Sequence, residues 1–160
     1  MKRSLFAILL LALALAAAGC GGDDDDGGGG ATDQDAAAQA TRDYLTAYTE
    51  GDGAAACAQI TEAAQQALEA AAVQAAERQG SEKTFTCEEI LTRAAGAGGQ
   101  SAEFLKPVID SIDAEDVSVE GDRAEVDVEA ASVPIVVENV DGEWLISEET
   151  VRQSFQLGQS

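Results

Sequence analysis

The chain has 160 residues, a formal net charge of -21, no histidine and three cysteines. So acidic a composition argues against a nucleic acid partner, because binding phosphates requires a basic surface. The lack of histidine removes the commonest general base and the commonest transition-metal ligand, so His-containing catalytic triads are excluded and neither a metal site nor a cofactor is predicted.

The first residues have the layout of a secretory signal peptide. Lys2 and Arg3 precede an apolar stretch of fourteen residues, 5–18, which small residues follow. As a helix this stretch rises only about 21 Å, less than the roughly 30 Å hydrocarbon core of a bilayer. We therefore predict that residues 1–19 are a cleaved leader and not a membrane span.

The leader ends in the run Ala17-Ala18-Gly19-Cys20. This run resembles the box of bacterial lipoprotein signals, in which small residues precede an invariant cysteine, although Ala17 stands where such boxes usually have leucine. The resemblance implies that the Cys20 thiol carries diacylglycerol and that cleavage leaves Cys20 as the first residue. The protein would then be anchored in the cell membrane by lipid, on its extracytoplasmic face. The alternative is an ordinary secretory leader with a stray thiol.

The segment 20–31 combines the lipidated cysteine with a tether of glycine and aspartate. No residue of the tether is apolar and large enough to be buried, so we expect a coil that spans roughly 17 to 20 Å. Asp23 to Asp26 are consecutive and lack the spaced ligands of a calcium loop. They are interpreted as a solvated spacer.

The remaining chain, about 130 residues, is enough for one domain, predicted at 32–148 with a C-terminal tail at 149–160. A first helix is predicted over 33–50, because an apolar stripe recurs at spacings of three and four, at Ala37, Ala40, Tyr44 and Tyr48. A helical pattern then runs to Gly80. It is either one helix or two joined near Thr61, which is itself a good cap.

Two further helices are predicted before the strands. Thr86 and Glu89 have the spacing of a capping box, so a short helix begins near Cys87. Residues 95–101 are glycine-rich and are interpreted as a break. Pro107 interrupts the next apolar segment, so a short helix is predicted only around 108–112.

Cys57 and Cys87 remain as an even pair in an oxidising compartment, which predicts a disulfide between them. The bridge would stabilise the fold by roughly 3 to 4 kcal/mol in the loop-entropy model. Two buried free thiols, or a redox pair without Cys-x-x-Cys spacing, are the alternatives.

From Val117 onward the apolar period changes to two, which predicts four short strands separated at Gly121-Asp122, near 131–132 and at Asp141-Gly142. One face of these strands is apolar and is expected to face inward; its members are Ala124, Val126, Val128, Ala130, Val133, Ile135, Val137, Trp144 and Ile146. The other face of the second strand holds Arg123, Glu125, Asp127 and Glu129, interpreted as a solvated row.

The order of helices followed by an antiparallel meander indicates an α+β class in which the helices cover the apolar face of the sheet. Together with "YLTAYTEGDGAAACAQIT", "VEGDRAEVDVE" and "VDGEWLIS", this layout resembles small bacterial lipoproteins of the nuclear transport factor 2-like superfamily. The resemblance implies a curved antiparallel sheet of about four strands that forms a cone with an apolar cavity. That scaffold carries isomerases, cyclases and dehydratases as well as non-catalytic binding and assembly domains, so the fold does not fix the function.

Tyr44, Tyr48 and Trp144 are the polar-tipped residues able to line such a cavity, unless they are ordinary core aromatics. The function predicted is that of a non-catalytic lipoprotein that binds a small apolar ligand or a protein partner. An isomerase-type or cyclase-type enzyme is the alternative, with Tyr44 or Tyr48 as hydrogen-bond donor and Asp43 or Asp110 as base. A structural module for envelope assembly, presenting its acidic sheet face to a cationic protein, is the third possibility.

Overall fold

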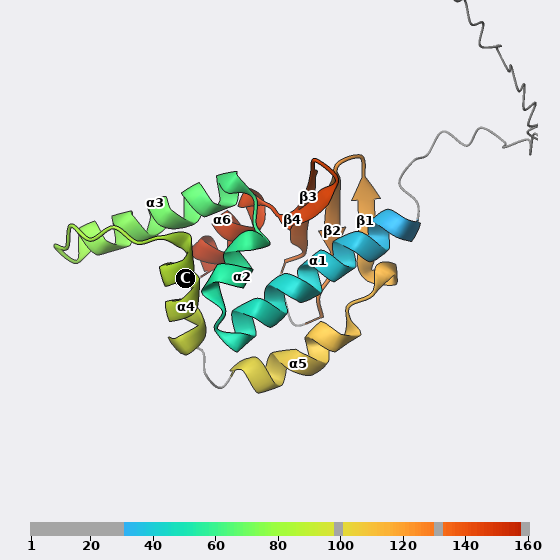
Figure 1. Cartoon of the computed structure of the whole chain (residues 1–160), viewed down its shortest axis with the longest axis horizontal. Coiled ribbons are helices and arrows are strands. Elements are labelled where there is room, and N and C mark those ends of the chain that lie inside the picture. The colour runs from blue at the N-terminus through green and yellow to red at the C-terminus, as the bar shows by residue number, and fades with distance from the viewer. Residues whose placement is uncertain (1–30, 98–100, 130–132, 158–160) are drawn as a thin grey trace, which may run out of the picture.

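A computed structural model of the chain describes residues 31–97, 101–129 and 133–157 (Figure 1). The predicted leader, Cys20 and tether residues 21–30 lie outside this part, as do the strand-break residues 131–132 and Ala130. Within the described residues, no helix combines the length and the apolar character needed to cross a bilayer.

The strands form one antiparallel sheet in the order β1-β2-β3-β4, so the predicted α+β class with four strands is confirmed. Two tight hairpins join the outer pairs, and positive φ angles at Gly121 (62°), Asp141 (55°) and Gly142 (91°) close them. The strands are β1 Val117–Glu120, β2 Arg123–Val126, β3 Ile135–Val140 and β4 Glu143–Ile146.

Helix α1, Ala31–Glu50, lies across the inner face of the sheet and contacts all four strands (Figure 1). Ala37 and Ala38 are fully buried, and their small side chains let the helix approach the strands closely. The Gln34 amide donates to the Val117 carbonyl at 2.9 Å and fixes the start of the helix against β1. The core between helix and sheet holds Ala124, Val126, Val137, Trp144 and Ile146.

The helical pattern after Gly51 forms two helices, α2 Gly53–Ala58 and α3 Glu62–Arg78. Thr61 separates them because its hydroxyl accepts the Ala64 N–H at 3.2 Å as an N-cap. The linking residues also pair with the outer edge of β4: the Ile146 N–H donates to the Gln59 carbonyl at 2.9 Å, and the Thr61 N–H donates to the Ile146 carbonyl at 3.0 Å. The end of this edge strand is thereby paired at Ile146.

Helix α4, Cys87–Ala97, begins with the predicted capping box. Thr86 Oγ1 accepts the Glu89 N–H at 3.3 Å, and the Glu89 carboxylate accepts the Thr86 N–H at 3.1 Å. The helix continues to Ala97, so the first residues of the predicted glycine-rich break are helical.

Helix α5 spans Ser101–Ser111 with Pro107 inside it, so the predicted start near 108 was wrong. Pro107 is exposed, and the carbonyl four residues earlier that its missing N–H leaves free can bond to water. The Arg42 guanidinium donates to the Ile112 carbonyl and ties the end of α5 to α1. A short 3-10 turn, η1 Ala114–Asp116, then leads into β1.

The C-terminal segment 149–160 was predicted as a tail. Its residues up to Leu157 instead belong to a further helix, α6 Glu148–Leu157. Ser147 precedes it and accepts the Thr150 N–H at 3.4 Å, while Glu148 and Glu149 occupy the first turn, where acidic residues favour a helix. The helix packs against α3 and β3. Residues 148–157 of the predicted tail region therefore pack with the rest of the described fold.

Helix α6 also covers part of the outer face of the sheet, on which the row of the second strand was predicted to be solvated. Val136 points away from α1 yet is only 1% exposed, because α6 lies over this part of β3. Val133, expected to face inward, is 37% exposed and lies before the strand begins. The predicted alternation holds on β2, where Ala124 and Val126 are buried and Glu125 is exposed, and it continues past the strand end at the exposed Asp127.

Candidate functional site

An apolar cavity of about 470 Å³ lies where α1, α3, α4 and α6 meet the start of β3. Large aliphatic side chains form most of its wall: Leu45, Ile60, Leu68, Leu91, Ile135 and Val151. Among the described lining residues, α3 contributes Leu68, and most other nonpolar positions of its sequence "EAAQQALEAAAVQAAER" are alanine. Alanine ends at the β-carbon and cannot fill the gap between packed helices.

Tyr44 and Tyr48 line this cavity from one side of α1. Their rings are stacked, with centroids 6.3 Å apart and an interplanar angle of 24°, as the i and i+4 positions of a helix permit. Burial raises the pKa of Tyr44 to about 12, and the neighbouring Tyr48 adds a smaller effect in the same direction. Tyr44 therefore stays neutral at physiological pH and can donate a hydrogen bond into the cavity.

The other polar side chains of the wall are already engaged. Thr150 Oγ1 donates to the Val136 carbonyl at 3.0 Å, and Ser154 Oγ donates to the Thr150 carbonyl at 2.9 Å. Among the described residues, neither tyrosine hydroxyl has a hydrogen-bond partner. The tyrosines are thus the groups available to orient a polar atom of a ligand.

Trp144 is placed elsewhere. It lies on β4 opposite Asn139, is 5% exposed, and packs in the core beneath α1. It is not among the described residues that line the cavity. The strand alternation that correctly turned Trp144 inward places it under α1 on the edge strand β4, whereas the cavity lies by the start of β3.

No carboxylate belongs to the described wall of the cavity. Asp43 and Asp110, considered as bases for an enzyme, are exposed on α1 and α5. In the part of the chain that the structure describes, no cluster of three or more His, Cys, Asp or Glu residues has the arrangement of a metal site. The site as described offers apolar contact and neutral hydrogen-bond donors.

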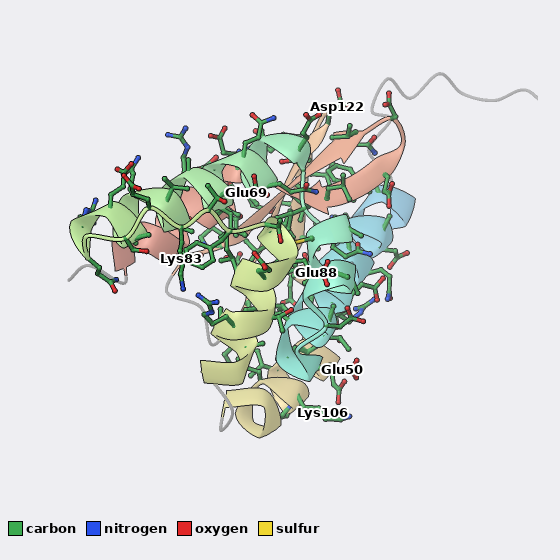
Figure 2. The ribbon with its side chains drawn as sticks, turned by 60° about the vertical axis from the view of Figure 1, so that its left-hand side comes forward. Glu50, Glu69, Lys83, Glu88, Lys106 and Asp122 are labelled. Atoms are coloured by element: carbon green, nitrogen blue, oxygen red, sulfur yellow. A yellow bond between two sulfur atoms is a disulfide. The ribbon has the colours of Figure 1, made fainter. Side chains whose placement is uncertain are left out.

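A disulfide joins Cys57 and Cys87, with 6.0 Å between their Cα atoms. Because α2 is short, Cys57 lies in its last turn. The Cys87 N–H donates to Glu69 on α3 at 3.0 Å (Figure 2). The start of α4 is therefore fixed to α2 and to α3, which holds the cavity wall formed by Ile90 and Leu91 in place.

A second depression adjoins the cavity along α3 and α4, with a volume of about 500 Å³. It is lined by Lys83 and Arg93 among small and apolar residues, and Ile90 and Ala94 belong to both walls. Sequence patterns did not predict this groove. The clustering of Arg78, Lys83 and Arg93 within an otherwise strongly acidic chain could have indicated it.

Comparison of the chain with protein-family models, with curated protein sequences and with solved structures finds no match.

Proposed function

We propose that this protein is a non-catalytic binding protein that takes up a small apolar ligand in the cavity between α1, α3, α4 and α6. The observation that carries the proposal is the character of the wall, which is aliphatic, free of carboxylates among its described residues, and provided with two tyrosine hydroxyls. A volume of about 470 Å³ falls in the range of small-molecule sites, roughly 300 to 1,000 Å³.

The same wall gives little support to an isomerase or cyclase. Proton transfer requires an acid or base within hydrogen-bond reach of the substrate, with a pKa near the working pH. Tyr44, with its pKa raised to about 12, is too weak an acid for that role and serves instead as a neutral donor.

The outer sheet face gives less support to the cationic-protein alternative. Arg123 interrupts the acidic row and pairs with Glu125 at 3.0 Å and with Glu149 at 2.6 Å. Helix α6 covers the neighbouring strand at Val136. Glu125, Asp127 and Glu129 stay exposed as predicted, but Glu125 is already paired with Arg123.

We separately propose, from the leader and Cys20, that a lipid anchors the protein on the extracytoplasmic face of the cell membrane. The Cys57–Cys87 disulfide supports an oxidising compartment. Tyr44 lies thirteen residues after the start of α1, so the cavity would open about 20 Å along this helix from the tether. Membership of the nuclear transport factor 2-like superfamily stays a prediction.

The binding proposal is tested with the uncharged fluorescent probe N-phenyl-1-naphthylamine, added to the mature chain carrying Cys20→Ser so that no detergent is needed. We expect a fluorescence increase that saturates at one probe per chain. Ala94→Phe places a ring in the cavity and should weaken probe binding about tenfold or more, while Ala63→Phe, at an exposed position of α3, should leave it unchanged. Absence of saturable binding, or equal binding by both variants, would refute the proposal.

The anchor is tested separately by fractionation of the host cell. The unmodified chain should partition with membranes, and Cys20→Ser should move it to the soluble extracytoplasmic fraction. Mass spectrometry of the mature chain should find acyl groups on Cys20. Unchanged partitioning of the variant would contradict the anchor.

A further inference from the structure

The groove beside the cavity differs in charge from the rest of the molecule. Lys83 and Arg93 both line it, and its described wall contains no Asp or Glu. The whole chain has only nine Lys and Arg against thirty Asp and Glu. The two cations therefore line the groove with no carboxylate among its described wall residues, although Glu82 adjoins Lys83 in the chain.

These two cations are not used to hold the fold by ion pairing. The salt bridges among the described residues involve Arg123 and Arg152, and neither Lys83 nor Arg93 takes part in one. Arg93 instead lies over the Phe85 ring, with its guanidinium carbon 4.8 Å from the ring centroid. This contact orients the guanidinium and leaves its N–H groups free to donate.

The groove and the cavity are neighbours along the same pair of helices. Leu68 on α3 belongs to the cavity, and Ala72, Ala75 and Ala76, on the following turns, belong to the groove. Ile90 and Ala94 of α4 contribute to both. An apolar surface thus runs between α3 and α4 from the tyrosines to the two cations.

We propose that the ligand is a single-chain amphiphile with one anionic head group, whose apolar chain occupies the cavity and whose head group lies in the groove against Lys83 and Arg93. This inference rests on the proposed function. The apolar chain gains from leaving water, and the anion gains charge-assisted hydrogen bonds from Arg93 and Lys83. Tyr44 and Tyr48 lie at the other end of the path and tolerate an apolar terminus or a single polar atom.

The sign of the charge provides the test. A net charge of -21 should favour a cationic amphiphile over an anionic one if long-range electrostatics alone decided binding. We compare dodecanoate with dodecyltrimethylammonium, using dodecanol as the uncharged reference, by their displacement of N-phenyl-1-naphthylamine at neutral pH and physiological salt. Dodecanoate should compete about five- to tenfold more strongly than the cation, as two exposed charge pairs permit.

Matched variants assign that preference to the groove. Lys83→Gln combined with Arg93→Gln should abolish it while leaving dodecanol and the neutral probe bound as before, which also shows that the fold is intact. Arg93→Lys should retain most of it. Lys106→Gln removes one positive charge from α5, away from Lys83 (Figure 2), and should have no effect.

Two failures are distinguishable. If the neutral probe and dodecanol bind but dodecanoate competes no better than the cation, the anionic-amphiphile inference is wrong and the apolar binding site stands. The inference is equally wrong if the preference survives in the Lys83→Gln/Arg93→Gln variant. If the neutral probe does not bind at all, both the proposed function and this inference fail.

Discussion

Thr150 on α6 and Val136 on β3 exchange two hydrogen bonds: Thr150 Oγ1 accepts the Val136 N–H at 2.7 Å and donates to the Val136 carbonyl at 3.0 Å. Strand β4 ends at Ile146, and just after it the Ser147 N–H still donates to the Val136 carbonyl at 2.9 Å, while Thr150 supplies the acceptor for the Val136 N–H. A side chain of α6 thereby completes the pairing of β3 at Val136 and fixes the helix that closes one side of the cavity.

Thr150→Val keeps the shape of the side chain and removes both hydrogen bonds. Because the Val136 N–H is then left without this acceptor, we expect the free energy of unfolding to fall by about 1 to 3 kcal/mol. Urea denaturation followed by circular dichroism measures the change. Thr46→Val, at an exposed position of α1, is the matched control and should shift stability by less than about 0.5 kcal/mol; equal effects would contradict this role of Thr150.

Gly53 is required by the close approach of α2 to α4. A β-carbon there would collide with Thr92 Oγ1 and the Glu88 carbonyl oxygen and would lie 2.8 Å from the Thr92 N. Gly53→Ala should therefore push the helices apart and cost about 1 to 3 kcal/mol. Gly96→Ala has open space around the new methyl group and should stabilise α4 by about 0.5 to 1 kcal/mol. Opposite signs in thermal unfolding are expected, and a neutral Gly53→Ala would refute the tight contact.

The Cys57–Cys87 disulfide closes a loop with a sequence separation of 30. Replacing both cysteines by alanine should lower the free energy of unfolding by roughly 3 to 4 kcal/mol, because the unfolded chain regains the freedom that the bridge removes. Reductant should lower the Tm of the unmodified protein and leave that of the double variant unchanged. Two titratable thiols at these positions in the native, secreted protein would contradict the bridge.

Burial of Tyr44 makes stability depend on alkaline pH. Its pKa rises from 10.0 to about 12 in the folded state. Between these values the folded state keeps a proton that the unfolded state has lost, so stability is unaffected below pH 10 and falls as pH rises toward 12. The loss should be on the order of 2 kcal/mol.

Two measurements check the Tyr44 assignment. Absorbance at the phenolate band, compared between the unmodified protein and Tyr44→Phe, should show the Tyr44 transition well above the ordinary range of tyrosine. Urea denaturation across the same alkaline range should show a smaller decline for Tyr44→Phe. An ordinary transition for Tyr44 would mean that its hydroxyl is solvated.

Local signals in the sequence determined much of the framework. The apolar alternation of Ala124 and Val126 fixed which face of β2 is buried, and the spacing of Thr86 and Glu89 marked the start of α4. Both are short-range patterns, because hydrogen-bond caps and strand alternation depend on neighbours within a few residues. The parity of the cysteines likewise indicated the Cys57–Cys87 bridge before any geometry was available.

Only the tertiary structure decided where the cavity and the groove lie between these elements. Tyr44 lines the cavity while Trp144, equally suited by chemistry, is packed under α1, because the cavity lies by the start of β3 and strand alternation specifies only a face. Helix α6 covers Val136 through contacts between segments distant in the chain, and Lys83 and Arg93 line one groove together with alanines of α3. Periodicity reports which side of an element is buried, but the partner that buries it, and the gap left between partners, depend on how the whole chain packs.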